Sequence, residues 1–158
     1  MNTAALLETG SSPSEGRTAW SEALAGQLAV EAQADRDCNT HEAVRFELKA
    51  ALLRAGLWPS DSRISDAVLE GPDGLFRYEV LGTGRSGYPH LRAGAVRLME
   101  LDRVETPSAD TRYLVLSEPP AEDWAPDAIR EAFGVHVVWR TAAGWHGPDV
   151  RTALRLTD

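Results

Sequence analysis

Cysteine, lysine and long apolar runs are scarce in this sequence of 158 residues. Cys38 is the only cysteine, so no disulfide can form within the chain, and a reducing compartment is expected. No apolar run approaches the ~20 residues of a membrane-spanning helix. No Lys or Arg precedes the short apolar patch near the N-terminus, which argues against a secretory signal. We therefore expect a cytoplasmic protein with no membrane partner.

Positive charge is also in short supply. The chain has 24 acidic and 16 basic residues, a formal charge of −8, and Lys49 is its only lysine. This balance argues against nucleic-acid binding through bulk charge, although a locally basic groove stays open as an alternative. The hydrophobic fraction of 43% is enough for the core of one domain.

The order of apolar patterns predicts one α/β domain. Residues 1–16 are expected to be a flexible tail, and 17–158 a single domain. Helical spacing predicts helices over 18–35, 41–55, 90–104, 126–133 and 149–156. Alternating or continuous apolar runs predict strands over 63–69, 75–81, 112–117 and 135–139. The turn at 71–74 joins the first two strands as a hairpin, and the later strands alternate with helices, which predicts a mixed sheet flanked by helices.

Two carboxylates carry the strongest chemical signal. Asp66 and Glu79 each lie near the middle of an otherwise apolar predicted strand, where a carboxylate is costly unless something compensates it. Paired across the hairpin, they would face one side and share a divalent cation with oxygen ligands. The alternative is that one or both point to solvent from the open face of the hairpin.

The surroundings of these carboxylates resemble the PD-(D/E)XK nuclease superfamily, which has a restriction-endonuclease-like fold. The resemblance rests on a helix with Glu42 or Glu47, a hairpin with Asp66 and Glu79, then a helix and a buried strand, over a core of about residues 40–140. It implies that Asp66 and Glu79 bind Mg²⁺ and that the helix glutamate completes the metal shell.

The sequence departs from that family at the lysine that orients the attacking water, because Leu81 stands there. The strand expected between the first helix and the Asp66 strand is short or missing, since 57–62 reads as a loop. A substitute cation would come from Arg85, Arg92 or Arg97, or from Lys49, and each of these is equally explained as an ordinary surface cation.

The loop 82–87, Gly-Thr-Gly-Arg-Ser-Gly, has two interpretations. Its glycines expose backbone amides that, with Arg85, can contact phosphate, or it is simply a flexible connection. It does not have the Gly-Lys-Ser/Thr ending of a Walker loop.

Two functions of different classes follow. The first is a catalytically degenerate or weakly active nuclease-fold protein that serves as a binding or assembly module in nucleic-acid metabolism, with DNA or RNA, a protein partner or a homodimer as its partner. The second is an active Mg²⁺-dependent nucleic-acid phosphodiesterase, a metal-dependent endonuclease. The expected catalytic residues are Asp66, Glu79, Glu42, Glu47, Arg92 and Arg97. The expected nucleic-acid contacts are Arg85, Arg92 and Arg97.

Overall fold

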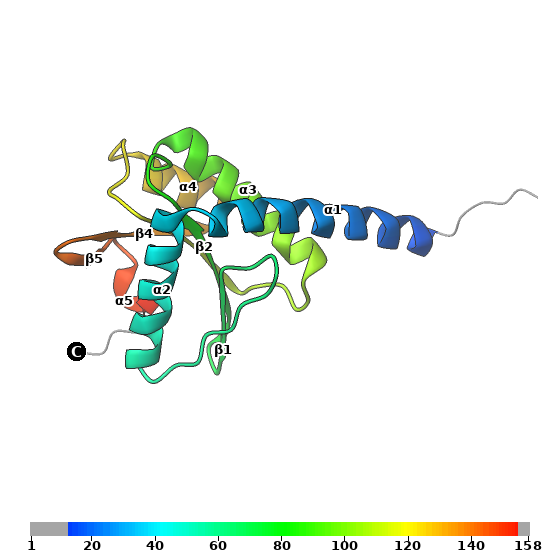
Figure 1. Ribbon diagram of the computed structural model, residues 1–158, viewed down its shortest axis with the longest axis horizontal. Helices are drawn as coiled ribbons and strands as arrows, with labels where there is room; N and C mark the ends of the chain where they lie inside the picture. The colour runs from blue at the N-terminus through cyan, green and yellow to red at the C-terminus, as the bar shows by residue number, and fades with distance from the viewer. Residues whose placement is uncertain (1–12, 155–158) are drawn as a thin grey trace, which may run out of the picture.

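The computed structural model describes residues 13–154 of the chain, with side chains from residue 19 onward. The helices are α1 (Pro13–Arg36), α2 (Asn39–Arg54), α3 (Tyr88–Val104), α4 (Ala125–Phe133) and α5 (Val150–Leu154). The strands are β1 (Ala67–Gly71), β2 (Gly74–Leu81), β3 (Thr111–Leu116), β4 (Val135–Thr141) and β5 (Gly144–His146). The described part thus contains five helices and five strands, in the order α1, α2, β1, β2, α3, β3, α4, β4, β5 and α5 (Figure 1). None of the described helices is long and apolar enough to cross a membrane.

The strands form one mixed sheet in the order β1-β2-β3-β4-β5. The hairpin β1–β2 is antiparallel, with Ala67 opposite Tyr78, and β4–β5 is also antiparallel. The strands β2, β3 and β4 are parallel, and α3 and α4 connect them as the pattern predicts. The expected mixed sheet and leading hairpin are thus confirmed. Ser60 adds an isolated antiparallel bridge to Val68 beside β1.

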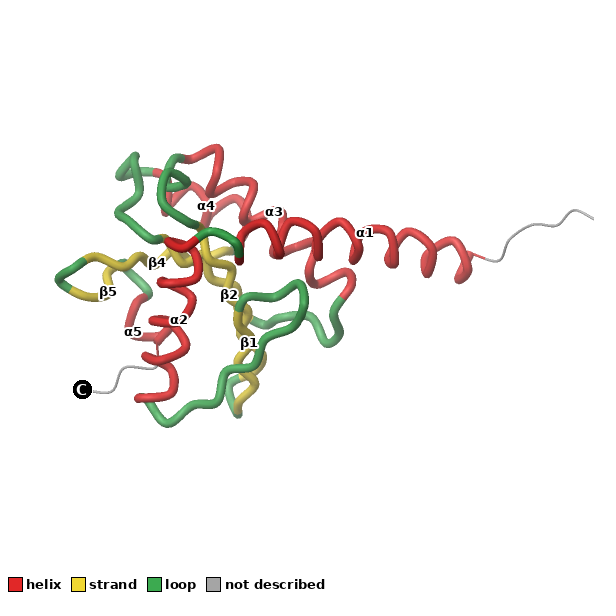
Figure 2. Tube along the Cα trace, in the orientation of Figure 1, coloured by secondary structure: helices red, strands yellow, loops and turns green. Residues whose placement is uncertain are grey.

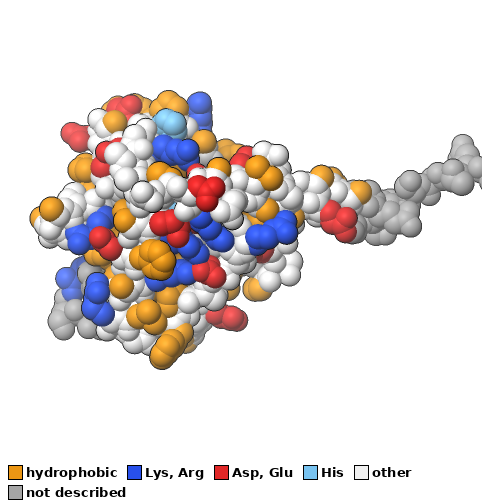
Figure 3. Space-filling view, viewed as in Figure 1, with side chains coloured by type: hydrophobic (Ala, Val, Ile, Leu, Met, Phe, Trp, Pro, Cys, Tyr) orange, Lys and Arg blue, Asp and Glu red, His pale blue; other side chains and the backbone are white. Residues whose placement is uncertain are grey.

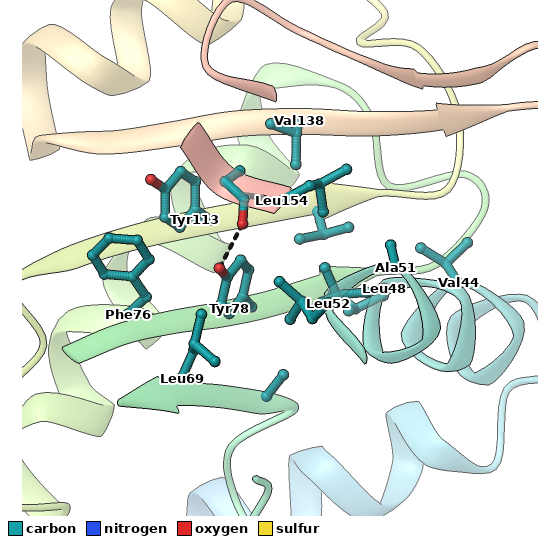
Figure 4. Packing of buried hydrophobic residues seen from close by; sticks show 14 residues of the cluster. Val44, Leu48, Ala51, Leu52, Leu69, Phe76, Tyr78, Tyr113, Val138 and Leu154 are labelled. Atoms are coloured by element: carbon teal, nitrogen blue, oxygen red, sulfur yellow. Dashed lines mark hydrogen bonds between the residues drawn. The ribbon is translucent and has the colours of Figure 1, made fainter. Parts of the chain in front are cut away.

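Helices cover both faces of the sheet (Figure 2). On one face, α2 and α5 pack on alternate residues of β2, β3 and β4, and the Tyr78 hydroxyl donates a hydrogen bond of 2.6 Å to the carbonyl of Ala153 (Figure 4). On the other face, α1, α3 and α4 cover the remaining alternate residues. Since β2 is buried on both faces, any polar side chain on it must find a partner inside the protein.

Gly94 lets α3 approach the sheet closely. A Cβ at this position would lie 2.8 Å from Leu114 Cδ2 and 3.4 Å from Leu81 Cδ2, so a larger residue would push the helix away. The C-terminal part of β2, with Glu79 and Leu81, therefore lies directly under α3. Figure 1 shows α1 crossing α3 and extending beyond the rest of the molecule.

Several predicted boundaries were wrong. The first helix begins at Pro13, so residues 13–16 belong to α1 and not to a tail, while the rest of that predicted tail, 1–12, lies outside the described residues. The first strand begins at Ala67 and not at 63, because side chains satisfy the preceding backbone: Arg36 donates to the carbonyls of Ser62 and Ser65. The short strand β5 was not predicted, because its three residues read as a turn.

Candidate functional site

Glu79 lies inside the protein on β2, with an exposed fraction of 1%. Its side chain points to the α1 and α3 side of the sheet, since it lines the same pocket as residues of both helices. The Arg97 guanidinium on α3 lies beside it, with Nε 3.2 Å from Oε1. Arg97 also bonds to Asp35 near the end of α1, where Nη1 and Oδ2 are 2.8 Å apart. Glu79 is therefore the inner end of an ion-pair chain that links the sheet to two helices.

Asp66 lies in the loop immediately before β1 and is equally buried, with an exposed fraction of 2%. Its Oδ2 accepts a hydrogen bond of 2.8 Å from the backbone N–H of Val80 and is 3.2 Å from Nε2 of His41. The other ring nitrogen of His41, Nδ1, lies 3.1 Å from Oε1 of Glu42. Asp66 thus immediately precedes the hairpin register, in which Ala67 lies opposite Tyr78, and the His41 imidazole contacts it there.

The pKa values of Glu79 and His41 respond to these surroundings. Burial raises the pKa of Glu79 well above its ordinary value, the charge of Asp66 raises it further, and Arg97 offsets only part of this. Burial alone would lower the pKa of His41, but the hydrogen bond and charge of Asp66 outweigh it, and the pKa is raised. The raised pKa favours the protonated imidazole between Glu42 and Asp66.

A pocket of about 630 Å³ opens between α1 and α3, above the C-terminal end of β2. This is where small ligands commonly bind in open α/β sheets, outside the carboxyl ends of the strands. Its lining includes Asp35, Glu79, Leu81, Arg85, Arg92 and Arg97. Asp35 bridges Arg97 and Arg85, whose Nη1 is 2.9 Å from Oδ1. Figure 3 shows acidic and basic side chains interleaved where α1 meets α2, so this region is mixed in charge.

The carboxylate pair does not fit Mg²⁺ as the resemblance would require. Mg²⁺ takes oxygen ligands in near-octahedral geometry. Here Oδ2 of Asp66 already has two hydrogen-bonding neighbours, and the guanidinium of Arg97 lies against Glu79. Among residues 13–154, no group of three or more His, Cys, Asp or Glu side chains is arranged to hold a metal ion. Protein cations thus stand beside both carboxylates.

Some of the other predicted site residues lie near Asp66 and Glu79, and others do not. Glu42 reaches the network through His41 and through Arg45, whose Nη1 is 3.0 Å from its Oε2. Glu47 points elsewhere and pairs with Arg140 at 2.5 Å, so Glu42 is the helix glutamate on the site side. Arg85 and Arg92 lie at the pocket, and the Arg92 guanidinium sits over the Tyr88 ring, 5.6 Å from its centroid.

Leu81 and Lys49 also have defined places. Leu81 is buried and lines the pocket together with Glu79, as residues two apart on a strand should. Lys49 pairs with Asp61, which also accepts a hydrogen bond of 2.6 Å from Arg45. In the described part of the chain, Lys49 is therefore held at the Asp61 side of α2, and it does not line the pocket.

Sequence reasoning missed His41 and Asp35 as members of this network. Asp35 had a detectable signal, because it shares a helix face with Leu28 and Ala32, both buried, and an acid on such a face needs a partner. His41 had a weaker signal, since it simply precedes Glu42 at the start of a predicted helix. Their partners are 25 and 62 residues away in sequence, which no local pattern reveals.

No family model, curated protein or solved structure matches the chain. The resemblance to the nuclease superfamily therefore rests on the residues and topology described above.

Proposed function

We propose that this chain is a catalytically degenerate nuclease-fold protein that serves as a binding module for single-stranded nucleic acid. The observation that carries the proposal is that protein side chains stand beside both carboxylates: Arg97 lies 3.2 Å from Glu79, and the His41 ring lies 3.2 Å from Asp66. Leu81, which cannot orient a water, occupies the position of the motif lysine beside them. Carboxylates that a nuclease uses for metal binding here hold helices α2 and α3 to the sheet.

The topology supports the nuclease-like part of the proposal. A helix, a hairpin with the two carboxylates, a second helix and a parallel strand follow one another as in the superfamily. The strand that seemed to be missing before the hairpin is marked by the bridge of Ser60 to Val68, with backbone hydrogen bonds of 2.8 and 2.7 Å. This bridge pairs the segment before the hairpin with β1, which supports the proposed likeness to the family's order of elements.

An aromatic and basic surface beside the pocket supports the nucleic-acid part. Trp124 is 56% exposed and its ring lies 5.1 Å from that of Tyr88, which in turn lies under Arg92. Arg92 lines the pocket, as does the half-exposed Arg85. Proteins that bind single strands stack unpaired bases on exposed rings and contact the backbone with basic side chains, and Trp124 with Arg85 and Arg92 offers both on a small scale. A net charge of −8 disfavours duplex binding through many phosphates.

Fluorescence anisotropy with labelled single-stranded DNA and RNA 12-mers, at low salt, tests the proposal. Trp124→Ala should weaken binding by roughly 5–100-fold, since stacking of one base contributes about 1–3 kcal/mol. Trp58→Ala is the matched control, because Trp58 is 84% exposed but lies in the loop between α2 and β1 and has no ring contact with Tyr88. The affinity of this variant should equal that of the wild type. Arg92→Glu should also weaken binding and reduce its salt dependence. Absence of wild-type binding, or equal effects of the two tryptophan variants, would reject the proposal.

A further inference from the structure

Glu79 has an unsatisfied hydrogen-bonding capacity. Both of its carboxylate oxygens are buried and accept no hydrogen bond from the described residues. The neighbouring Nε of Arg97 is close enough to attract the charge, but its N–H is not aligned for a hydrogen bond and also has no partner. Buried polar groups nearly always have partners, so two free acceptors on one carboxylate call for an explanation. A ligand that donates to both oxygens would supply it.

The oxygens of Glu79 have almost no exposed surface, so a ligand in the adjoining pocket reaches them by displacing the side chains that cover them. Glu79 lines the cavity of about 630 Å³ between α1 and α3, next to the apolar Leu81, Ala93 and Phe133. A cavity of this size has room for a nucleoside-sized group. Its mouth carries Arg85 and Arg92, which can remain in contact with a phosphate while the attached group enters the cavity.

The hydrogen-bonding capacity of the Glu79 carboxylate defines which chemical groups can bind in the pocket. The ionised form of Glu79, which burial disfavours in the empty site, has two acceptor oxygens, and a ligand that donates to both would stabilise that form. Two parallel N–H groups do this best, in the fork geometry that arginine uses toward carboxylates. We propose that the pocket binds a group that presents two adjacent N–H donors to Glu79, and that in a bound single strand this group is the Watson–Crick edge of an unstacked guanine. The assignment of this group to guanine in a single strand rests on the proposed function, whereas the site for two adjacent donors does not.

Base chemistry explains the choice of guanine. Its N1–H and N2–H₂ groups are adjacent donors, whereas adenine and cytosine place a ring-nitrogen acceptor beside their single amino group. An acceptor facing Glu79 would leave one buried oxygen unpaired and repelled, and a site built for two hydrogen bonds rejects such analogues strongly. Enzymes that take a base out of the stack read it in the same way, through its Watson–Crick edge in a closed pocket.

Isothermal titration calorimetry of the full chain with three probes tests the inference: guanosine monophosphate, adenosine monophosphate and agmatine. Agmatine carries a guanidinium, the same pair of donors from a different source. The wild type should bind the guanine nucleotide at least tenfold more tightly than the adenine nucleotide. Glu79→Gln should abolish that preference, because an amide replaces one acceptor by a donor. Glu100→Gln removes a charge from the same pocket without touching Glu79, and should keep the preference.

A second variant tests the pocket without changing Glu79. Ala93→Phe should fill the cavity from its rim and reduce guanine nucleotide binding at least fivefold. Ala23→Phe, on an exposed turn of α1 outside the pocket, is the control for a new surface ring. Circular dichroism of each variant establishes that a loss of binding is not a loss of fold.

The outcomes separate this inference from the proposed function. Equal affinity for the two nucleotides, unchanged affinity in Glu79→Gln, or no binding of any probe would overturn the inference even if Trp124-dependent binding of oligonucleotides persists. Glu79-dependent binding of agmatine alone would uphold the donor-pair site and overturn its assignment to guanine.

Discussion

At the scale of single residues, Glu79 is held in a state that costs stability. Its environment contains the charges of Asp66, Asp35 and Glu31 as well as Arg97, and burial with the like charges outweighs the one cation. Such a carboxyl is an expensive feature for a core strand. Buried groups that oppose folding are concentrated at functional sites, which is why Glu79 and not the exposed acids is central to this account.

The raised pKa of Glu79 predicts a particular dependence of stability on pH. Above pH 4.5, its ordinary value, the folded state holds the proton more tightly than the unfolded state does, so the free energy of unfolding falls as pH rises toward the raised pKa. Glutamine cannot ionise, so Glu79→Gln should melt a few degrees higher than the wild type at pH 7 and equally at pH 4. Arg97 keeps Asp35 as a partner in that variant. Thermal melts between pH 4 and 8 measure this, and a variant that is less stable at every pH would contradict it.

Residue-scale analysis of the sequence singled out the two carboxylates but could not identify their partners. The expectation that Asp66 and Glu79 face one another followed from the hairpin turn and the period of two along a strand. Arg97 was one of four equivalent candidate cations, and only the packing of α3 on β2 distinguishes it. Tertiary contacts determine which charged residues pair. The sequence alone therefore identifies the buried acids and several candidate basic partners, but not the pairs.

At the scale of elements, the packing of α3 on the sheet sets the geometry of the pocket. The helix can approach because Gly94 has no side chain at the point of contact with Leu114 and Leu81. This closeness brings Arg97 to Glu79 and places the pocket between α3 and α1. A helix interior ordinarily disfavours glycine by about 1 kcal/mol relative to alanine, so its presence here has a packing reason.

Gly94→Ala should therefore destabilise the protein despite the better helix propensity of alanine. The new Cβ would overlap a core leucine, and overpacking of this kind costs typically 1–3 kcal/mol. Gly26→Ala in α1 is the matched control, because its added Cβ would have no heavy atom within 4 Å. The control should gain stability and Gly94→Ala should lose it, as measured by denaturant unfolding. Equal gains in both variants would show that α3 does not depend on a close approach.

The elements themselves were predictable where periodicity is long and turns are strong. The hairpin at 71–74 and the parallel strands joined by α3 and α4 were predicted and observed. Strand β5 was not, because three residues are too few for a pattern. The extra residues assigned to the first strand failed for a different reason: Ser62 Oγ accepts from the backbone N–H groups of Ile64 and Ser65, so that segment satisfies its backbone without a strand.

At the scale of the whole molecule, the candidate site lies on one of the two covered faces of the sheet. Each face has an apolar core, and the face under α1 and α3 also contains the ion pairs of Glu79 and the pocket. The overall charge of −8 and the ring pair Trp124 and Tyr88, tilted at 45°, together fit a protein that binds a few unpaired nucleotides through rings and a few arginines. The account accordingly predicts weak, salt-sensitive binding without turnover.

The most direct test follows the anisotropy of one end-labelled single strand over time, in the presence of the protein and millimolar Mg²⁺. The account predicts a rise on addition of protein that then stays constant, with an intact strand recovered on a denaturing gel. A signal that decays below the value of the free strand, with cleavage that Asp66→Ala or Glu79→Ala abolishes, would instead establish an active phosphodiesterase. No rise at all, in DNA and in RNA, would contradict the binding module itself.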